Sequence, residues 1–487
     1  MKPVQVFLFM VTLFLCLGVI SLVFPREGIR VGEIYTVDYP SLKDLFTLDT
    51  IQEKDFTFVF ENEFDIDSLE LAAKIKRDST RQARAKDSIR QWQLKLHYPS
   101  DDKSLLHALF QTLEKTNTSG KTRIMHYGDS QIEGDRITGY LRHKLQNKFG
   151  GNGPGLVASV PLVKSAGIKQ AYSDNWQRYT LYGKQDSTVT HNRYGPLASF
   201  GRFTPIIPDS VKTDSLFTDT TTHTGWITFE PSGITYPKTR HYERMKLLMG
   251  NIEAPLTFRI YSADSLLEEK IIPPNDGPLL AIERAVSDQQ PLRLEFESKT
   301  SPDVYGISLE GNKGIIVDNI AMRGSSGTLF RKINRALLAQ SFNQFDIKLL
   351  ILQFGGNVMP YIDNFKECEQ YGRWFESQLV LLKGMIPDVA IIVIGPSDMG
   401  TFINGEYESY DLLDEVRDAL KEATFNQGGV YWDLLEAMGG KGAMKAWVEA
   451  NPSLAAKDYV HFNHRGAEKV AQMFYNALIA DYNAYKD

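Results

Sequence analysis

Two near-continuous apolar segments of strand length constrain the fold of this chain most strongly. They are residues 347–353 and 389–394, which read IKLLILQ and VAIIVI. Because neither segment alternates with polar residues, both faces of each strand must be buried, as in a parallel sheet covered by helices. A third strand is expected at 122–127, and helical spacing recurs at 105–113, 132–149, 327–342, 365–385, 410–424 and 464–485. This alternation predicts an α/β domain with a mainly parallel sheet.

The middle of the chain has a different pattern of apolar and polar residues. Between residues 165 and 317, short segments with strand-like alternation are separated by Gly, Pro, Asp and Asn, for example at 225–229, 256–261, 292–296 and 305–309. Such a pattern is typical of an all-β sandwich or jelly roll. We therefore expect residues 165–317 to be a β-rich domain inserted into a discontinuous α/β domain, residues 101–164 and 318–487.

The first 25 residues indicate a targeting segment. Residues 4–24 contain no charged side chain, and as a helix this run would span about 31 Å, close to the thickness of a bilayer core. Because the run ends without a small-x-small site, an uncleaved membrane anchor is favoured over a cleaved signal peptide. Residues 26–100, rich in charge from 63 to 95, are expected to be a stalk or linker. Either interpretation places the rest of the chain outside the cytoplasm, anchored at a bacterial membrane on its periplasmic side or secreted.

Composition excludes several classes of function. The 487 residues carry a net charge of -6 and no basic footprint for nucleic acid. Only Cys16 and Cys368 occur, and Cys16 lies within the apolar N-terminal run, so an intramolecular disulfide is not expected. No Cys and His spacing suits zinc. The chemistry must therefore come from other side chains.

Four short blocks carry that chemistry. Ser130, in Gly128-Asp129-Ser130, follows a strand and opens a helix, where free backbone N–H groups face a developing oxyanion. Asp458 precedes His461 by three residues and can orient its imidazole, which a serine needs as a general base. Asn357 follows two glycines after the strand at 347–353, and its amide can donate to an oxyanion. Gly324, after the strand-like 314–320, could add a backbone N–H.

In this order on an α/β chain, the four blocks resemble the SGNH/GDSL hydrolase superfamily. The resemblance implies a flavodoxin-like three-layer fold, with Ser130 as nucleophile, His461 as general base and acid, and Asp458 orienting His461. It also implies an oxyanion hole from Ser130, Gly324 and Asn357, with Gly327 as the alternative glycine. Two departures are Gln131 where Leu is usual after the serine, and Gly356 where Thr is commoner. No metal ion or organic cofactor is required.

The continuation of the serine block, from Gln131 to the Gly-Pro-Gly at 153–155, is similar to bacterial peptidoglycan O-acetylesterases, in which a carbohydrate-binding-like β-domain follows this block. The resemblance implies removal of O-acetyl groups from an extracytoplasmic glycan. Two alternatives remain open: an O-acetyltransferase acting with a membrane-bound O-acyltransferase partner, and a non-catalytic glycan-binding protein.

Some residues near these blocks have simpler interpretations. His126, at the end of a buried strand, is expected to be packed rather than to act as the base, and His464 to lie at the surface. Glu133 and Asp135 could contact a sugar, but a solvated helix surface is the favoured interpretation. Four aromatic residues of the insert could stack on sugars, although aromatic residues in sandwiches more often belong to the core; they are Trp226, Tyr236, Tyr242 and Tyr261.

Overall fold

The computed structural model describes residues 95–116, 120–207, 221–403 and 405–487, the segments 29–31 and 35–37, and the single residues Gln5, Phe9 and Thr12. The chain divides into two units, residues 1–55 and 56–487. In the first unit, strands β1 (Ile29–Val31) and β2 (Tyr35–Val37) pair antiparallel. The expected anchor at 4–24 and most of the linker at 26–100 lie outside the described residues. No helix within the described part has the length and apolar character needed to cross a membrane.

The second unit is built on a five-stranded parallel sheet. Its strands are β3 (Lys121–Gly128), β15 (Gly314–Ala321), β16 (Ile347–Gln353), β17 (Ala390–Ile394) and β20 (Val430–Trp432). They lie in the order β15-β3-β16-β17-β20, with parallel pairing throughout. Counted along this domain, that is the flavodoxin-like order 2-1-3-4-5, which reverses direction beside β3.

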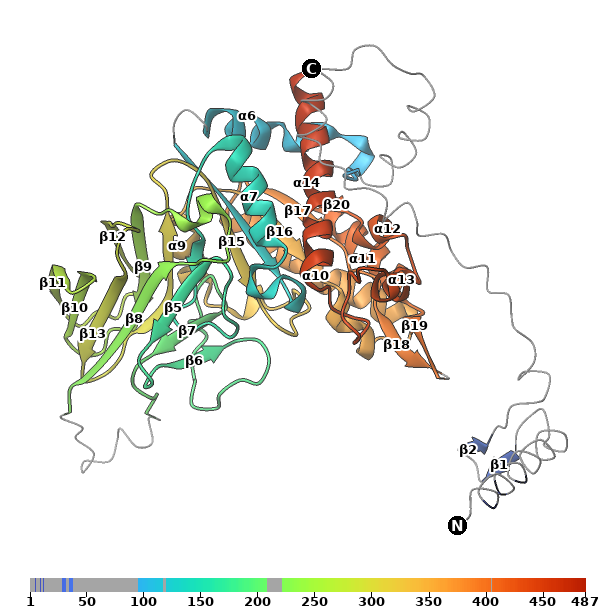
Figure 1. Ribbon diagram of the computed structural model, residues 1–487, viewed down its shortest axis with the longest axis horizontal. Helices are drawn as coiled ribbons and strands as arrows, with labels where there is room; N and C mark the ends of the chain where they lie inside the picture. The colour runs from blue at the N-terminus through green and yellow to red at the C-terminus, as the bar shows by residue number, and fades with distance from the viewer. Residues whose placement is uncertain are drawn as a thin grey trace. The chain divides into compact units, whose positions relative to one another are not determined.

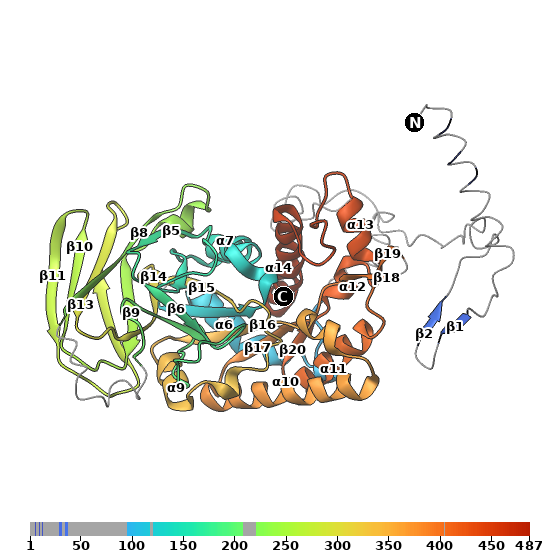
Figure 2. The same cartoon turned by 90° about the horizontal axis from the view of Figure 1, so that it is seen from below.

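Helices cover both faces of the parallel sheet (Figure 2). The helices are α6 (His107–Thr116), α7 (Thr138–Phe149) and α14 (His464–Lys486) on one face, and α9 (Arg335–Asn343), α10 (Phe365–Met385) and α11 (Leu413–Asn426) on the other. Neighbouring residues of one strand supply the two cores: Ile351 packs with the α14 face, and Leu350 and Leu352 pack with the α10 face. The expected α/β fold with mainly parallel strands is confirmed.

The inserted domain is a sandwich of two antiparallel sheets, drawn beside the parallel sheet in Figure 1. One sheet has the order β11-β10-β13-β8-β5, and the other has the order β12-β9-β14-β7-β6 with β4 paired to β14. The strands are β4 (Gly155–Val157), β5 (Ile168–Tyr172), β6 (Gln177–Thr180), β7 (Ser199–Arg202), β8 (His223–Pro231), β9 (Arg244–Gly250), β10 (Leu256–Ser262), β11 (Ser265–Ile272), β12 (Leu280–Ala285), β13 (Leu292–Ser298) and β14 (Asp303–Glu310). Alternate residues of β13 (Leu292, Leu294 and Phe296) are buried in the core between the sheets, so the expected β-insert is present.

The boundaries of the insert differ from the expected 165–317. Strand β4, at 155–157, already pairs with β14 of the sandwich, whereas β15, from Gly314, belongs to the parallel sheet. The chain crosses between the domains on glycines: a Cβ on Gly151 would lie 2.2 Å from Ile315 O, and Gly151 has φ +110°. This close approach of two backbones requires glycine, so the crossing comes earlier than the hydrophobic pattern indicated.

The N-terminal edge of the α/β domain also differs from the expected residue 101. His97 forms an antiparallel bridge with Tyr431 of β20, and Leu96 and Tyr98 are buried. Several short elements were not expected from the sequence. They are β20, the hairpin β18 (Gly400–Ile403) and β19 (Glu406–Ser409), helices α12 (Leu434–Met438) and α13 (Ala443–Glu449), and the 3-10 turns at Pro99–Asp101, Lys103–Leu106, Pro237–Arg240, Phe330–Lys332 and Gly356–Tyr361.

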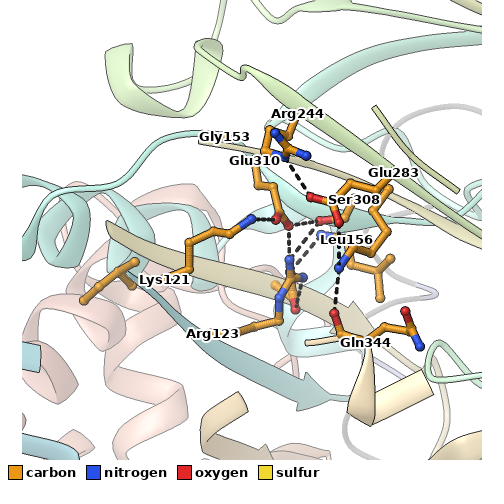
Figure 3. Close-up of polar contacts among 12 residues, drawn as sticks. Lys121, Arg123, Gly153, Leu156, Arg244, Glu283, Ser308, Glu310 and Gln344 are labelled. Carbon is orange, nitrogen blue, oxygen red and sulfur yellow. Dashed lines mark hydrogen bonds and ion pairs between the residues drawn. The ribbon is translucent and has the colours of Figure 1, made fainter. Parts of the chain in front are cut away.

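A buried ion network joins the two domains (Figure 3). The Arg123 guanidinium, on β3, donates to both carboxylate oxygens of Asp318 at 2.8 and 2.9 Å, and also to Ser308 and Glu310 on β14. Burial opposes the negative charge of Glu310, but Arg123 and the ammonium of Lys121 outweigh it and lower the pKa of this carboxyl to about 2. Asp318 also accepts from the backbone N–H of Leu156 at 2.8 Å. One cation therefore binds residues of both domains.

Replacing Arg123 should destabilise the whole unit. Arg123→Met leaves the carboxylates of Asp318 and Glu310 buried without their cation, so we expect a loss of about 3–5 kcal/mol in the free energy of unfolding, measured in urea at pH 7. Lys169→Met is the control, because Lys169 pairs with Glu230 at the sandwich surface with 67% of its side chain exposed; it should cost less than about 1 kcal/mol. Equal losses would contradict the role given to the buried network.

Candidate active site

The predicted functional blocks follow strands that end at the same level of the sheet. Gly128, the last residue of β3, pairs with Ala321 of β15 and with Gln353 of β16, and Gln353 pairs with Ile394 of β17. Because the strands are parallel and in register, the segments after them emerge together at the carboxyl edge. In open α/β sheets this edge, beside the reversal of strand order, is where ligands bind.

The serine block forms a sharp turn after β3. Asp129 caps the 3-10 turn η3 (Ser130–Asp135), accepting from the backbone N–H of Gln131 at 2.9 Å. A Cβ on Gly128 would lie 2.9 Å from the Ile132 side chain and 3.2 Å from Gln353 O. A side chain at position 128 would require Ile132 or the β16 backbone to shift, so the glycine favours close packing of the turn against β16, and the turn presents Ser130 at the sheet edge.

Three of the predicted residues form one hydrogen-bonded chain. Ser130 Oγ lies 2.9 Å from His461 Nε2, and His461 Nδ1 lies 2.8 Å from Asp458 Oδ2. The other oxygen of Asp458 accepts from the backbone N–H groups of Val460 and His461, each at 3.0 Å. The structure thus brings together residues that are more than 300 positions apart in the sequence.

The charge of Asp458 fixes the direction of these hydrogen bonds. Partial burial opposes its ionisation, but the hydrogen bonds from the His461 and Val460 backbone and from the imidazole outweigh burial and lower its pKa. A carboxylate can only accept, so His461 Nδ1 carries the proton and Nε2 keeps a free lone pair. That lone pair accepts from the Ser130 hydroxyl, the arrangement that a general base requires.

Two side chains that were given no role in the sequence analysis fix His461 against the serine turn. The Gln131 amide donates to Val460 O at 2.7 Å and accepts from the backbone N–H of Phe462 at 3.3 Å, so it holds the backbone on both sides of His461. Arg136 donates to Phe462 O at 3.1 Å and also to Ser130 O. The departure from Leu at position 131 was the available signal, since an amide directly after the serine needs hydrogen-bond partners.

Asn357 lies between the serine block and the glycine block. Its side-chain Nδ2 donates to Asp129 Oδ2 at 2.9 Å and to Ser325 O at 3.2 Å. Burial raises the pKa of the Asp129 carboxyl to about 6, despite the hydrogen bonds from Gln131 and Asn357 and the nearby His461. The Asn357 amide is therefore engaged on both sides, and the contact to Ser325 O is the longer of the two.

The two candidate glycines have different surroundings. Gly327 N–H donates to Ser325 Oγ at 3.1 Å, and a Cβ at this position would lie 2.6 Å from the Phe354 ring. Gly324, with φ +74°, has open space on its Cβ side. The engaged N–H and crowded Cβ side of Gly327 favour Gly324 as the candidate glycine, although Gly324 does not line the cavity around Ser130.

A cavity lies beside Ser130 at the sheet edge. Three of the predicted residues line it: Ser130, Asn357 and His461. The other lining residues are Asp129, Gln131, Gln353, Phe354, Gly356, Gly395, Pro396, Ser397, Met399 and Val460. Its walls come from the ends of β3, β16 and β17 and from the loop before α14. Within the described ranges, no group of three or more His, Cys, Asp or Glu side chains could hold a metal ion.

The hairpin β18–β19 supports the segment that contains Asp458 and His461. The rings of Tyr407 and Tyr459 stack 3.8 Å apart with an angle of 8° between their planes, and Gly400 N–H donates to Tyr459 O at 2.7 Å. Tyr459 has φ +57°, a backbone conformation that costs energy for a residue with a side chain. These contacts hold the turn between Asp458 and His461, and no signal in the sequence pointed to Tyr407.

The two neighbouring histidines lie where they were expected. His126 is fully buried, between Gln353 and Thr138, and burial lowers its pKa to about 3. His464 begins α14 with 75% of its side chain exposed, 3.7 Å from Glu468.

The expectation for Glu133 and Asp135 was wrong. They do not lie on a solvated helix surface: both are buried, Glu133 in a bidentate pair with Arg323 and Asp135 in one with Arg142. The kink of η3 at Gly134, φ +65°, turns both carboxylates inward, which a regular helix would not do.

The four aromatic residues of the insert have separate environments. Tyr242 is buried in the sandwich core. Tyr236 stacks on His143 of α7 at 4.2 Å and donates to Glu468 of α14, so it joins the two domains. Trp226 and Tyr261 flank the Arg293 guanidinium at 5.4 and 5.8 Å. The four rings do not form one platform.

Comparison with known proteins supports the fold assignment. No protein-family model and no curated protein sequence matches the chain. Among solved structures, a peptidoglycan O-acetylesterase matches with a TM-score of 0.60 and 20% identity, over 80% of this chain and 99% of that one. An acetyl xylan esterase (TM-score 0.26, 13% identity, 34% of this chain and 81% of that one) and a salicylyl-acyltransferase from a tetracycline biosynthetic pathway (TM-score 0.27, 10% identity, 65% and 98%) also match. The first similarity shows that this chain and that peptidoglycan O-acetylesterase share their fold over most of both chains, which agrees with the expected α/β domain with an inserted β-domain.

Proposed function

We propose that the protein is a serine esterase that removes O-acetyl groups from a glycan outside the cytoplasm. The observation that carries this proposal is the hydrogen-bonded chain from Ser130 through His461 to Asp458 at the carboxyl edge of the sheet. A serine hydroxyl is a poor nucleophile near neutral pH unless a base removes its proton. Here the base, His461, contacts the Ser130 hydroxyl through Nε2, and the Asp458 carboxylate sets the tautomer of its imidazole.

In the first half of the reaction, Ser130 Oγ attacks the acetyl carbonyl carbon while His461 Nε2 takes the hydroxyl proton. The carbonyl oxygen becomes an oxyanion, stabilised by the backbone N–H of Ser130 and by the Asn357 amide; Gly324, which does not line this cavity, stays the candidate for a third donor. As the tetrahedral intermediate collapses, the bond to the sugar oxygen breaks and His461 returns its proton to that oxygen. The sugar leaves with a free hydroxyl, and the acetyl group stays on Ser130.

In the second half, water replaces the sugar. His461 removes a proton from the water as its oxygen attacks the acetyl-serine carbonyl, and then protonates Ser130 Oγ as that bond breaks. Acetate leaves and the resting serine is restored. Asp458 stays ionised throughout and stabilises the imidazolium that forms twice in the cycle.

Three observations support the choice of substrate class and location. The chain shares its two-domain fold with a solved peptidoglycan O-acetylesterase. The β-sandwich begins after α7, in the stretch of chain that follows the serine block, and we assign it the role of binding the sugar. The uncharged run at residues 4–24 favours export and a position at the cell envelope.

The nucleophile can be tested by acetate release from O-acetylated glycans. Ser130→Ala removes the attacking oxygen, so we expect the rate to fall about 10³-fold or more. Ser397→Ala is the control, since Ser397 also lines the cavity; it should change the rate less than about tenfold. Equal release by the wild type and Ser130→Ala would end the nucleophile assignment.

The contacts that Gln131 makes on both sides of His461 predict a loss of turnover without a loss of binding. Gln131→Leu removes the hydrogen bonds to Val460 and Phe462, so kcat should fall about tenfold with KM changed less than about twofold. Gln378→Leu is the control, because that buried amide likewise donates to one backbone carbonyl (Trp374) and accepts one backbone N–H (Arg331), far along the chain from His461. A fall in kcat for both variants would show that general destabilisation, not the position of His461, is responsible.

The buried charge of Asp129 predicts a pH-dependent cost in stability. The folded pKa of about 6 lies above the unfolded value, so protonated Asp129 stabilises the fold below about pH 4, and this stabilisation is lost as the pH rises to about 6. Asp129→Asn has no such charge. Relative to the wild type, its free energy of unfolding should therefore rise by about 3 kcal/mol between pH 4 and pH 7. Urea titrations across this range give the difference, and parallel curves would contradict the prediction.

A further inference from the structure

A second cavity lies at the junction of the two domains, at the other end of the serine turn. Glu133, Gly134 and Asp135 of η3 line it on one side, together with the end of β15. Side chains of the insert line the other side, among them Arg178 and Tyr182. The cavity around Ser130 is lined by residues 129–131. The same short turn therefore contributes to both cavities.

The charges around this second cavity leave one cation without a carboxylate. Glu133 is held by Arg323 at 2.8 and 2.6 Å, and Asp135 by Arg142 at 2.5 and 3.0 Å. Each of these carboxylates is paired with one guanidinium, so the two pairs are neutral. Arg178 is the cation of the cavity lining that neither pair includes. Among the described residues, no carboxylate lies within 4.0 Å of its guanidinium.

The Arg178 guanidinium is also short of hydrogen-bond acceptors. One Nη contacts the hydroxyl of Tyr182, whereas Nε is buried and has no partner in the described structure. A buried donor without an acceptor costs free energy, about 1–3 kcal/mol and more for a charged group. A guanidinium binds a carboxylate through two parallel N–H groups, so a carboxylate ligand would relieve this cost.

The remainder of the cavity lining combines apolar and amide side chains. The apolar side chains include Leu156, Leu162 and Leu197, and the amides are those of Asn319 and Gln170. Leu162 is 51% exposed at the rim. Apolar surface with a few polar groups is typical of sites that bind small organic ligands.

We propose that this junction cavity binds the carboxylate of an acidic sugar, with Arg178 as the specificity-determining residue. This inference rests on the proposed function, because it names the substrate class: a glycan that carries an O-acetyl ester on one group and a carboxylate on the same or an adjacent sugar. The ester enters the cavity at Ser130 while the carboxylate lies against Arg178. Neutral acetylated glycans lack the second contact and bind more weakly.

The test measures binding, so that it does not depend on turnover. Full-length Ser130→Ala protein is titrated calorimetrically with two O-acetylated acidic oligosaccharides, one containing muramic acid and one containing a uronic acid, and with each after conversion of its carboxylate to the amide. For at least one of the two, the amide should bind about 10- to 100-fold more weakly, as expected for loss of a charge-assisted hydrogen bond. Adding Arg178→Gln should remove this difference, and Arg178→Lys should restore part of it.

A matched control removes the same charge elsewhere. Arg335 is exposed at the start of α9, and Arg335→Gln in the Ser130→Ala background should keep the full preference for the acid. Equal binding of acid and amide, for both oligosaccharides with Arg178 intact, overturns the proposal even if the Arg178 variants fail to fold. A preference that survives Arg178→Gln also overturns it.

The binding site and the proposed activity can fail separately. Arg178-dependent binding of the acid, together with no acetate release by the wild type, would support the cavity and refute the esterase. Acetate release from acidic and neutral glycans alike, with no difference in binding between acid and amide, would support the esterase and refute the role of Arg178.

Discussion

The parallel pairing of β3 with both of its neighbours is the constraint on which the site depends. Gly128 pairs with Ala321 on one side and with Gln353 on the other, so three chain segments leave the sheet at one level. A shift of one residue in either pairing would turn the following segment toward the opposite face of the sheet. The glycine at 128 is part of the same constraint, because its missing Cβ lets the serine turn pack against β16.

The site at this edge of the sheet contains groups that lower the stability of the fold. Asp129 is a buried carboxylate whose pKa is raised to about 6 by burial, yet it holds the Asn357 amide beside Ser130. Tyr459 adopts a left-handed backbone conformation, yet this turn places Asp458 against His461. Buried charges and backbone strain of this kind concentrate at functional sites, where the surrounding packing has to hold them. Here the Gln131 amide and the Tyr407 ring supply part of that support.

The sequence predicted the parts of the fold that depend on hydrophobic pattern. The strand at 347–353 and the helix at 365–385 have the expected bounds, because a continuous apolar run and a long amphipathic helix are strong signals. The three-residue strand β20 was missed because it is too short to show a pattern. The burial of Glu133 and Asp135 was missed as well, since it depends on a kink and, for Glu133, on an arginine 190 residues further along the chain. The short blocks that meet at the carboxyl edge of the sheet could be located in the sequence, whereas the side chains that hydrogen-bond to them could not.

The insertion point of the sandwich explains why two cavities share one turn. The chain enters the sandwich after α7 and returns in β15, and β15 lies directly beside β3. Both crossings are therefore close to the strand that carries the serine block, and the Arg123 network joins β3, β14 and β15 at this junction. Because buried ion pairs resist separation, the sandwich keeps a fixed relation to η3. Under the proposed function, a substrate group bound by the insert would then be held at a constant distance from Ser130, which is the positioning that attack by a hydroxyl requires.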